Sequence, residues 1–126
     1  MKLSIDTIII FVEDVDRLKH FYVDTLKLKL VEEITAEWVL VNAGNCHIGL
    51  HKIGKEYLAA AKESTIGNNT KIVFEVDDDI FETREALLKA NVSLSEIKTF
   101  DNYDFWLCDG KDPEGNVFQL KQEKEE

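Results

Sequence analysis

The stretch TIIIFVED at residues 7–14 decides the fold, because a related stretch, KIVFEVDD, returns at residues 71–78. Both are apolar, rich in β-branched residues and end in acidic residues, a pattern typical of a strand followed by a turn that caps a helix. At an offset of 64 residues, three pairs are identical: Ile8 and Ile72, Val12 and Val76, Asp14 and Asp78. A repeat at fixed spacing predicts two related halves.

The same order of elements follows each repeat. A helix with one apolar face comes first, formed in the first half by Leu18, Phe21, Tyr22 and Leu26 and in the second by Ile80, Phe81, Leu87 and Leu88. Three strand-like segments then follow in each half, at residues 28–34, 37–41 and 46–53 and at residues 93–99, 103–108 and 117–121. We therefore predict an α+β fold made of two βαβββ modules.

The length of 126 residues fits a single domain, with the first module at residues 1–54 and the second at 70–126. The connector at 55–69 has strong helix propensity over residues 55–64 and is turn-prone after that. Two cysteines, Cys46 and Cys108, without a C-x-x-C spacing favour reduced, structural thiols over a disulfide or a zinc cluster.

The charge and hydropathy pattern excludes several classes of partner. A formal charge of -10 repels a phosphate backbone, so we expect no binding to nucleic acid. The longest apolar run, Ile8 to Val12, is far shorter than the ~20 residues that cross a bilayer, and the first residues do not begin a signal-peptide pattern. We expect no membrane partner and a cytoplasmic location.

Strand alternation separates the residues of the two repeats into two faces. One face is apolar without exception and is predicted to pack on the helices: Ile8, Ile10, Val12, Ile72, Phe74 and Val76. The other is mixed, as expected of a cavity wall: Thr7, Ile9, Phe11, Lys71, Val73 and Glu75. Trp38 and Trp106 occupy comparable positions in the two modules, and we expect one aromatic of each neighbouring pair to face the cavity.

The two repeats, the Phe21-Tyr22 pair and the closing DPEGNVFQL at residues 112–120 resemble the vicinal oxygen chelate superfamily. This superfamily includes glyoxalase I, bleomycin-resistance and fosfomycin-resistance proteins and extradiol dioxygenases. The resemblance covers nearly the whole chain. It implies that each module forms a curved sheet, that the two sheets enclose a cavity, and that the chain forms a homodimer.

The resemblance also implies four positions at which metal-using members carry His, Glu or Gln. These positions match Thr7, Gly49, Lys71 and Gln119. Only Gln119 is a suitable ligand, and the ammonium of Lys71 would repel a divalent ion. We therefore expect no metal and no other cofactor, although a replacement site that combines His47 or His51 with Glu75 or Gln119 stays open. Both histidines together would be a poor site, because on one strand they lie ~13 Å apart.

Lys71 is the most informative single residue, because a strand-interior lysine is almost never buried without a partner. Three interpretations are open. The ammonium pairs with Glu75 or its neighbours, it meets an anionic ligand, or it reaches solvent at the mouth of the cavity.

The leading hypothesis is a metal-free small-molecule-binding protein of the glyoxalase/bleomycin-resistance type. Its expected ligand is a polar or anionic organic molecule, not a cationic glycopeptide, because the carried-over positions are neutral or basic. The expected ligand-binding residues are Thr7, His47, His51, Lys71, Trp106 and Gln119. The sequence assigns no catalytic residue. The alternatives are a metal-dependent lyase or dioxygenase with displaced ligands and a dimeric scaffold without a ligand.

Overall fold

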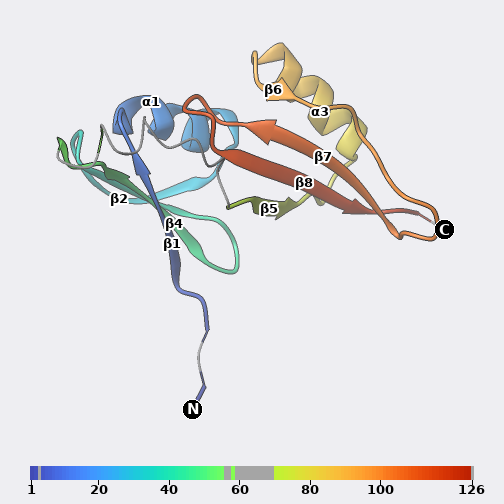
Figure 1. Cartoon of the computed structure of the whole chain (residues 1–126), viewed down its shortest axis with the longest axis horizontal. Helices are drawn as coiled ribbons and strands as arrows, with labels where there is room; N and C mark the ends of the chain where they lie inside the picture. Colours follow the sequence, from blue (N-terminus) through green and yellow to red (C-terminus); the bar gives the residue numbers. More distant parts are fainter. Residues whose placement is uncertain (3, 56–57, 59–69, 126) are drawn as a thin grey trace. The chain divides into compact units, whose positions relative to one another are not determined.

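The chain forms two compact units, residues 1–65 and 66–126, each with its own sheet and helix (Figure 1). The computed structural model describes residues 1–2, 4–55, 58 and 70–125. The helix predicted at 55–64 lies outside these residues except for Lys55 and Leu58. No helix among the described residues combines the length and the apolar character needed to cross a membrane.

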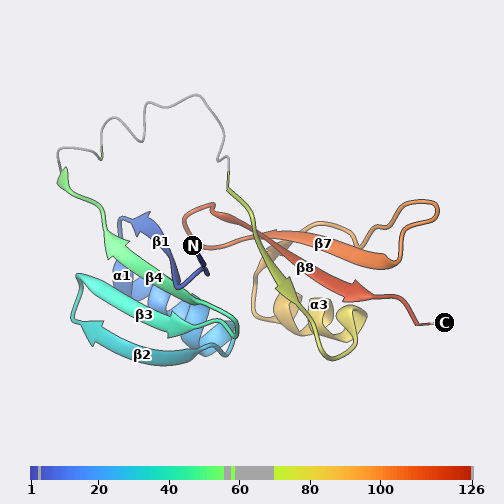
Figure 2. The ribbon, with the colours of Figure 1, turned by 90° about the horizontal axis from the view of Figure 1, so that it is seen from below.

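Unit 1 is a four-stranded sheet in the order β1-β4-β3-β2, with β1 parallel to β4 and the other neighbours antiparallel. A helical segment lies on one of its faces (Figure 2). The elements are β1 (Thr7–Val12), α1 (Val15–Lys19), η1 (His20–Thr25), β2 (Lys29–Ile34), β3 (Trp38–Asn42) and β4 (His47–Lys52).

The helix of unit 1 begins where the acidic turn after β1 predicts it. The side chain of Asp14 accepts a hydrogen bond from the backbone N–H of Arg17, 3.1 Å away, and so caps α1. From His20 the helix widens into a π-helical turn, in which the N–H of Leu26 donates to the carbonyl of Phe21. The core between the helix and the sheet includes the buried residues Val15, Leu18, Phe21, Tyr22, Val39, Val41, Ile48 and Leu50.

Unit 2 repeats this topology with the strand order β5-β8-β7-β6, in which β5 is parallel to β8. Its helix is capped by Asp79, whose side chain accepts a hydrogen bond from the N–H of Phe81. The elements are β5 (Ile72–Glu75), α3 (Ile80–Lys89), β6 (Ser93–Leu94), β7 (Phe105–Lys111) and β8 (Val117–Glu123). The predicted α+β class with two βαβββ modules is confirmed.

Two strands of unit 2 differ from their predicted bounds. The predicted strand at 93–99 is reduced to β6, followed by one isolated bridge between Lys98 and Leu107. The predicted strand at 103–108 begins at Phe105 and continues to Lys111. The polar stretch before β7 turns instead of extending, because Asn102 adopts a positive φ of 61° and the N–H of Tyr103 bonds back to Phe100.

The DPEGN segment forms the turn between β7 and β8. Buried Asp112 organises it, since its Oδ1 accepts hydrogen bonds from the N–H groups of Glu114 and Asn116, both at 2.9 Å. Its Oδ2 accepts a third from the side-chain amide of Asn116. Gly115 supplies a positive φ of 86°. The segment that carries the family resemblance is therefore a side-chain-stabilised turn of defined length.

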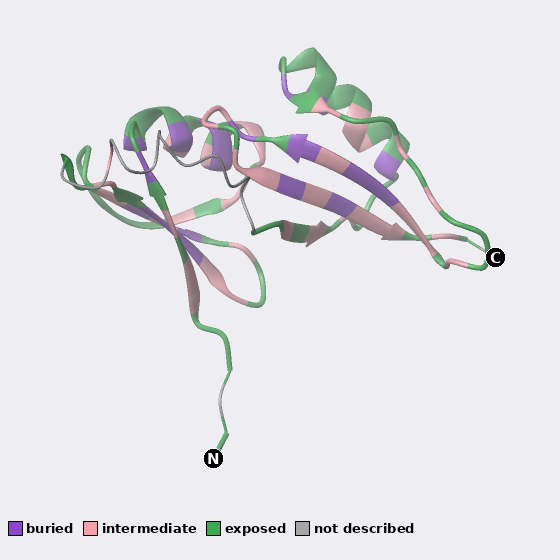
Figure 3. Ribbon diagram, viewed as in Figure 1, coloured by how far each residue is buried: buried purple, intermediate pink, exposed green. Residues whose placement is uncertain are grey.

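The predicted alternation of faces is present in both units. On the side away from the helices, Ile9, Phe11 and Val73 are 48%, 61% and 49% exposed. Their neighbours on the helix side, such as Val12 and Phe74, are buried or half-buried (Figure 3). Each sheet thus has a packed helix face and an open face, and the open faces carry the candidate functional residues.

Candidate functional site

The open face of unit 1 carries a row of aromatic rings, which we call the aromatic face and define by Phe11, Trp38 and His51. The strand register sets Phe11 beside His51, and His51 beside Trp38. The ring centroids of Phe11 and His51 lie 5.4 Å apart, and those of Trp38 and His51 lie 5.9 Å apart in an edge-to-face arrangement. Thr7 and His47 are register partners on the same face.

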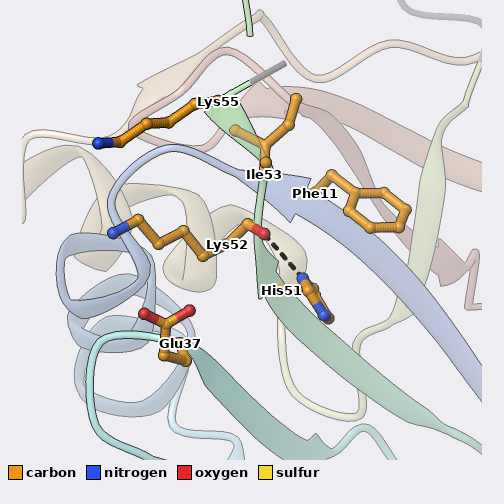
Figure 4. A pocket seen from close by; sticks show the side chains of 7 residues that line it. Phe11, Glu37, His51, Lys52, Ile53 and Lys55 are labelled. Carbon is orange, nitrogen blue, oxygen red and sulfur yellow. Dashed lines mark hydrogen bonds between the residues drawn. The ribbon is translucent and has the colours of Figure 1, made fainter. Parts of the chain in front are cut away.

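A cavity of about 750 Å³ lies at the end of this face, where β1 and β4 finish (Figure 4). Its wall is largely apolar, and the charged ends of three side chains reach away from the Phe11 ring. The lining residues are Phe11, Glu37, His51, Lys52, Ile53, Gly54 and Lys55. The volume is that of a typical small-molecule site, about 300 to 1,000 Å³.

His51 is oriented within this cavity by the backbone. Its Nδ1 lies 2.8 Å from the carbonyl oxygen of Lys52, so Nδ1 must carry a proton to donate there. In the neutral ring this leaves Nε2 as a hydrogen-bond acceptor. The imidazole therefore offers a ligand both an aromatic surface and one polar atom.

The indole of Trp38 covers Gly49, the position that the resemblance assigns to a metal ligand in unit 1. A Cβ atom at Gly49 would run into the six-membered ring of Trp38. The indole N–H donates to the carboxylate of Glu32 at 3.2 Å, which helps to hold the ring there. Any side chain at Gly49 would have to displace this indole.

On the open face of unit 2, three polar side chains meet, which we call the lysine cluster and define by Lys71, Asp109 and Gln119. The ammonium of Lys71 lies 3.2 and 3.3 Å from the two carboxylate oxygens of Asp109. The side-chain amide of Gln119 donates to Oδ1 of Asp109 at 2.9 Å. The partner of Lys71 is thus Asp109 on β7 and not the predicted Glu75, since no hydrogen bond or ion pair from Lys71 to Glu75 is present among the described residues.

Asp109 stays ionised in this cluster. Burial is the largest single influence and would raise its pKa, but it is outweighed by the hydrogen bonds from Gln119 and Lys71 together with the positive charges of Lys71 and Lys98. The pKa of Asp109 is therefore below its ordinary value. Its negative charge holds the Lys71 ammonium in place.

The open face of unit 2 is much less acidic than the rest of the unit. Residues 66–126 carry seven basic and fifteen acidic side chains. By strand register, four of the basic residues lie on the open face, namely Lys71, Lys98, Lys111 and Lys121, against three acidic residues, namely Glu75, Asp109 and Glu123. Lys121 also stacks its ammonium 4.1 Å from the ring centroid of Phe105. An anion is better matched to this face than to the rest of the unit.

Trp106 does not share this face with Gln119. Its ring packs edge-to-face on Phe81 of α3, with centroids 5.3 Å apart, so it lies on the helix side of the sheet. The aromatic on the open side is its neighbour Phe105. A second cavity, of about 520 Å³, lies beside Trp106, and its lining is dominated by Asp77, Asp78, Asp79, Glu123 and Glu125.

The four positions that the resemblance assigns to metal ligands do not fit a metal. Thr7 bonds to the side chain of its neighbour Asp6, Gly49 lies under an indole, and Lys71 is a cation. Among the residues that the structure describes, no three or more His, Cys, Asp or Glu side chains are arranged to hold an ion. Gln119 alone retains donor chemistry suited to a divalent ion.

Cys108 is not placed for nucleophilic chemistry. Cys108 is fully buried in the core of unit 2, and burial raises the pKa of its thiol. Cys46 is half-buried and free. A raised pKa keeps Cys108 protonated at neutral pH, so it acts as a small apolar core residue.

The profile of the Glyoxalase/Bleomycin resistance protein/Dioxygenase superfamily matches residues 4–120 of the chain. The chain belongs to this superfamily. The resemblance seen in the two repeats and the DPEGN turn is thereby confirmed. A search of curated proteins finds no match.

Solved structures show the same fold. A glyoxalase/bleomycin resistance protein/dioxygenase family enzyme from Burkholderia phytofirmans PsJN has a TM-score of 0.80 and 19% identity, over 97% of this chain and 100% of that one. A lactoylglutathione lyase from Agrobacterium tumefaciens has a TM-score of 0.75 and 17% identity, over 97% and 95%. An integron cassette protein from V. cholerae has a TM-score of 0.72 and 22% identity, over 97% of both.

Two contributors to these surfaces were not among the predicted ligand-binding residues. Phe11 was placed on the cavity side by alternation but not chosen as a binding residue. Asp109 was not considered, although a strand continued past Cys108 would have set it opposite Gln119. Asp109 was missed because the predicted strand ends at Cys108, whereas β7 continues to Lys111.

Proposed function

We propose that the protein is a metal-free small-molecule-binding member of the glyoxalase/bleomycin-resistance superfamily. The observation that carries this proposal is the cavity of about 750 Å³ beside Phe11 and His51, whose wall is largely apolar. A cavity of this size suits an organic molecule, and aromatic side chains are typical of its lining. The poor fit of Thr7, Gly49 and Lys71 to a metal supports the metal-free part of the proposal.

The charged groups at the cavity favour a ligand with an apolar, planar body and one anionic group. Phe11 and His51 offer ring surfaces on which such a body can stack. The ammonium groups of Lys52 and Lys55 exceed the single carboxylate of Glu37, so the charged part of the lining is net positive. This agrees with the preference for an anionic ligand over a cationic glycopeptide.

The predicted residues enter this proposal to different extents. His51 lines the cavity, and Thr7 and His47 lie on the same open face. Lys71 and Gln119 belong to unit 2, where we propose a separate polar surface. Trp106 is left out because its ring packs on α3. A homodimer and a cytoplasmic location remain predictions.

The test is binding of a panel of aromatic carboxylates, each paired with its uncharged methyl ester, measured by thermal shift and calorimetry. We expect the carboxylates to raise Tm, because a ligand that binds only the folded state stabilises it. Phe11→Ala should weaken binding about fivefold, which corresponds to the ~1 kcal/mol of one aromatic contact. Lys52→Gln combined with Lys55→Gln should remove the preference for the carboxylate over its ester.

The matched control is Val73→Ala, which truncates another exposed apolar side chain, on the open face of the other unit. It should leave binding unchanged, and neither truncation should alter stability by more than ~0.5 kcal/mol. Equal losses in Phe11→Ala and Val73→Ala, or no carboxylate that raises Tm, would contradict the proposed site. Stoichiometric metal in protein purified without a chelator would contradict the metal-free part and favour a lyase or dioxygenase.

A further inference from the structure

The lysine cluster brings together groups from three neighbouring strands. Lys71 directly precedes β5, Gln119 lies on β8 and Asp109 lies on β7, and the sheet order is β5-β8-β7. The side chain of Lys71 therefore spans β8 to reach Asp109. Only a long side chain can make this connection, because neighbouring strands are about 4.8 Å apart.

Without its lysine, the cluster would have the donor chemistry of a divalent-ion site. Asp109 offers a carboxylate that remains ionised, and Gln119 offers an amide oxygen, since its amide N–H is used to bond Asp109. Carboxylate and amide oxygens are the ligands that hard divalent ions prefer. The cation that contacts the Asp109 carboxylate is instead the Lys71 ammonium, and the Gln119 side chain bonds to the same carboxylate.

We infer that Lys71 is a built-in replacement for a divalent ion, whose ammonium takes the place of the metal beside Asp109 and Gln119. The inference rests on the metal-free character of the proposed function. The inference also specifies which group of a ligand would bind to the Lys71 ammonium, namely an anionic oxygen such as that of a carboxylate. The Lys71 side chain is 44% exposed, so the ammonium remains accessible while Asp109 holds it.

A fixed ammonium differs from a metal in ways that matter for function. It carries one positive charge and three N–H donors, and it needs no ion from solution. It cannot act as a divalent Lewis acid, but it can orient a carboxylate. The cluster is thus suited to binding and positioning and not to metal-assisted chemistry.

The test replaces the ammonium by a metal ligand. Lys71→His places an imidazole, and Lys71→Glu a carboxylate, at the start of β5. Neither side chain is long enough to contact Asp109 directly, but each can share a bound ion with Asp109 and Gln119 across β8. Relative to wild type, we expect Lys71→His to bind Ni²⁺ or Zn²⁺ at least about tenfold more tightly, and Lys71→Glu to gain affinity for Mn²⁺. Binding is measured by calorimetry, and the visible spectrum of the Co²⁺ form of Lys71→His reports its ligands.

The controls separate this site from other histidines. Lys71→Met removes the ammonium without adding an oxygen or nitrogen ligand, so it should gain little affinity and reveals any background binding at His47 or His51. Adding Asp109→Asn to Lys71→His should abolish the gain, because the carboxylate ligand is lost. Circular dichroism confirms that each variant is folded, as expected for substitutions at exposed or half-exposed positions.

Three outcomes are distinguishable. If neither Lys71→His nor Lys71→Glu binds metal better than Lys71→Met, the inference fails while the proposed function stands. If wild type itself binds a stoichiometric metal that Asp109→Asn removes, both fail. If Lys71→His gains metal affinity and Asp109→Asn reverses the gain, the inference holds even where no aromatic carboxylate binds to unit 1.

Discussion

The sheet of unit 1 and the sheet of unit 2 have the same strand order, yet their open faces differ in chemistry. On the helix side both are closely packed, as Ile48 and Phe118 show, since both are almost completely buried. On the open side, unit 1 presents the aromatic face and unit 2 presents the lysine cluster. The comparison teaches that packing constrains the helix face of each repeat, whereas the open face can change its chemistry without changing the fold.

Equivalent positions show how far the open faces differ. Gly49 and Gln119 occupy the same place in the last strand of their units, as register partners of Ile9 and Val73. Gly49 makes room for an indole, whereas Gln119 bonds to a carboxylate. One repeat has become an apolar surface, and the other has become a polar one.

The largest expected effect tests the similarity of the helix faces. Ile48→Ala and Phe118→Ala should both destabilise strongly, by about 2–5 and 3–5 kcal/mol, because each leaves a cavity in a packed core. Urea unfolding measures the loss. Phe11→Ala, on the open face, is the control and should cost less than ~0.5 kcal/mol. A mild effect at either buried position would mean that the two helix faces are not equally packed.

A smaller effect tests the indole over Gly49. Gly49→Ala should destabilise by about 1–3 kcal/mol, since the new methyl group forces the Trp38 ring away. In a background of Trp38→Leu, which lacks the indole, the same substitution should cost much less, and the urea midpoints of the four proteins form a double-mutant cycle. Additive effects would show that Trp38 does not occupy this space.

The smallest effect concerns the lysine cluster and depends on pH. Because the folded pKa of Asp109 is lowered, its contribution to stability is present above about pH 4, the ordinary value, and is lost as pH falls through the folded pKa. Lys71→Met should raise that pKa towards the ordinary value. The ion pair of Lys71 with Asp109 should contribute less than about 1 kcal/mol to the free energy of unfolding, because both partners are partly exposed.

An NMR titration of the Asp109 carboxyl carbon measures this shift directly. Lys19→Met is the matched control, because it breaks the ion pair of Lys19 with Glu33 in unit 1 and leaves the lysine cluster intact. Should Asp109 titrate identically in wild type and Lys71→Met, the lysine would not be the group that stabilises its carboxylate.

Much of the fold could be predicted from the two repeats, because their helix-side residues are apolar without exception and alternation fixes their face. The π-helical turn after His20 could not, since nothing in the local residue types distinguishes it from a regular helix. The start of β7 at Phe105 instead of residue 103 depends on the turn at Asn102, whose positive φ is permitted but not required by asparagine.

The candidate site was less predictable because it depends on register between strands. For Lys71, the sequence offered Glu75, but four residues along a strand are ~13 Å apart, so a partner on another strand is nearer. That partner, Asp109, lies one residue beyond the predicted end of its strand. For the adjacent pair Phe105 and Trp106, alternation requires opposite faces but does not say which residue faces the helix.

The turn stabilised by Asp112 sets the strand register of the lysine cluster. Its three side-chain hydrogen bonds set how many residues separate β7 from β8, and that number places Asp109 directly opposite Gln119. A single residue added to this turn would shift the pairing by one position and leave Asp109 and Gln119 on opposite sides of the sheet. The DPEGN turn, which carries the family resemblance, thus also sets the strand register on which the lysine cluster depends.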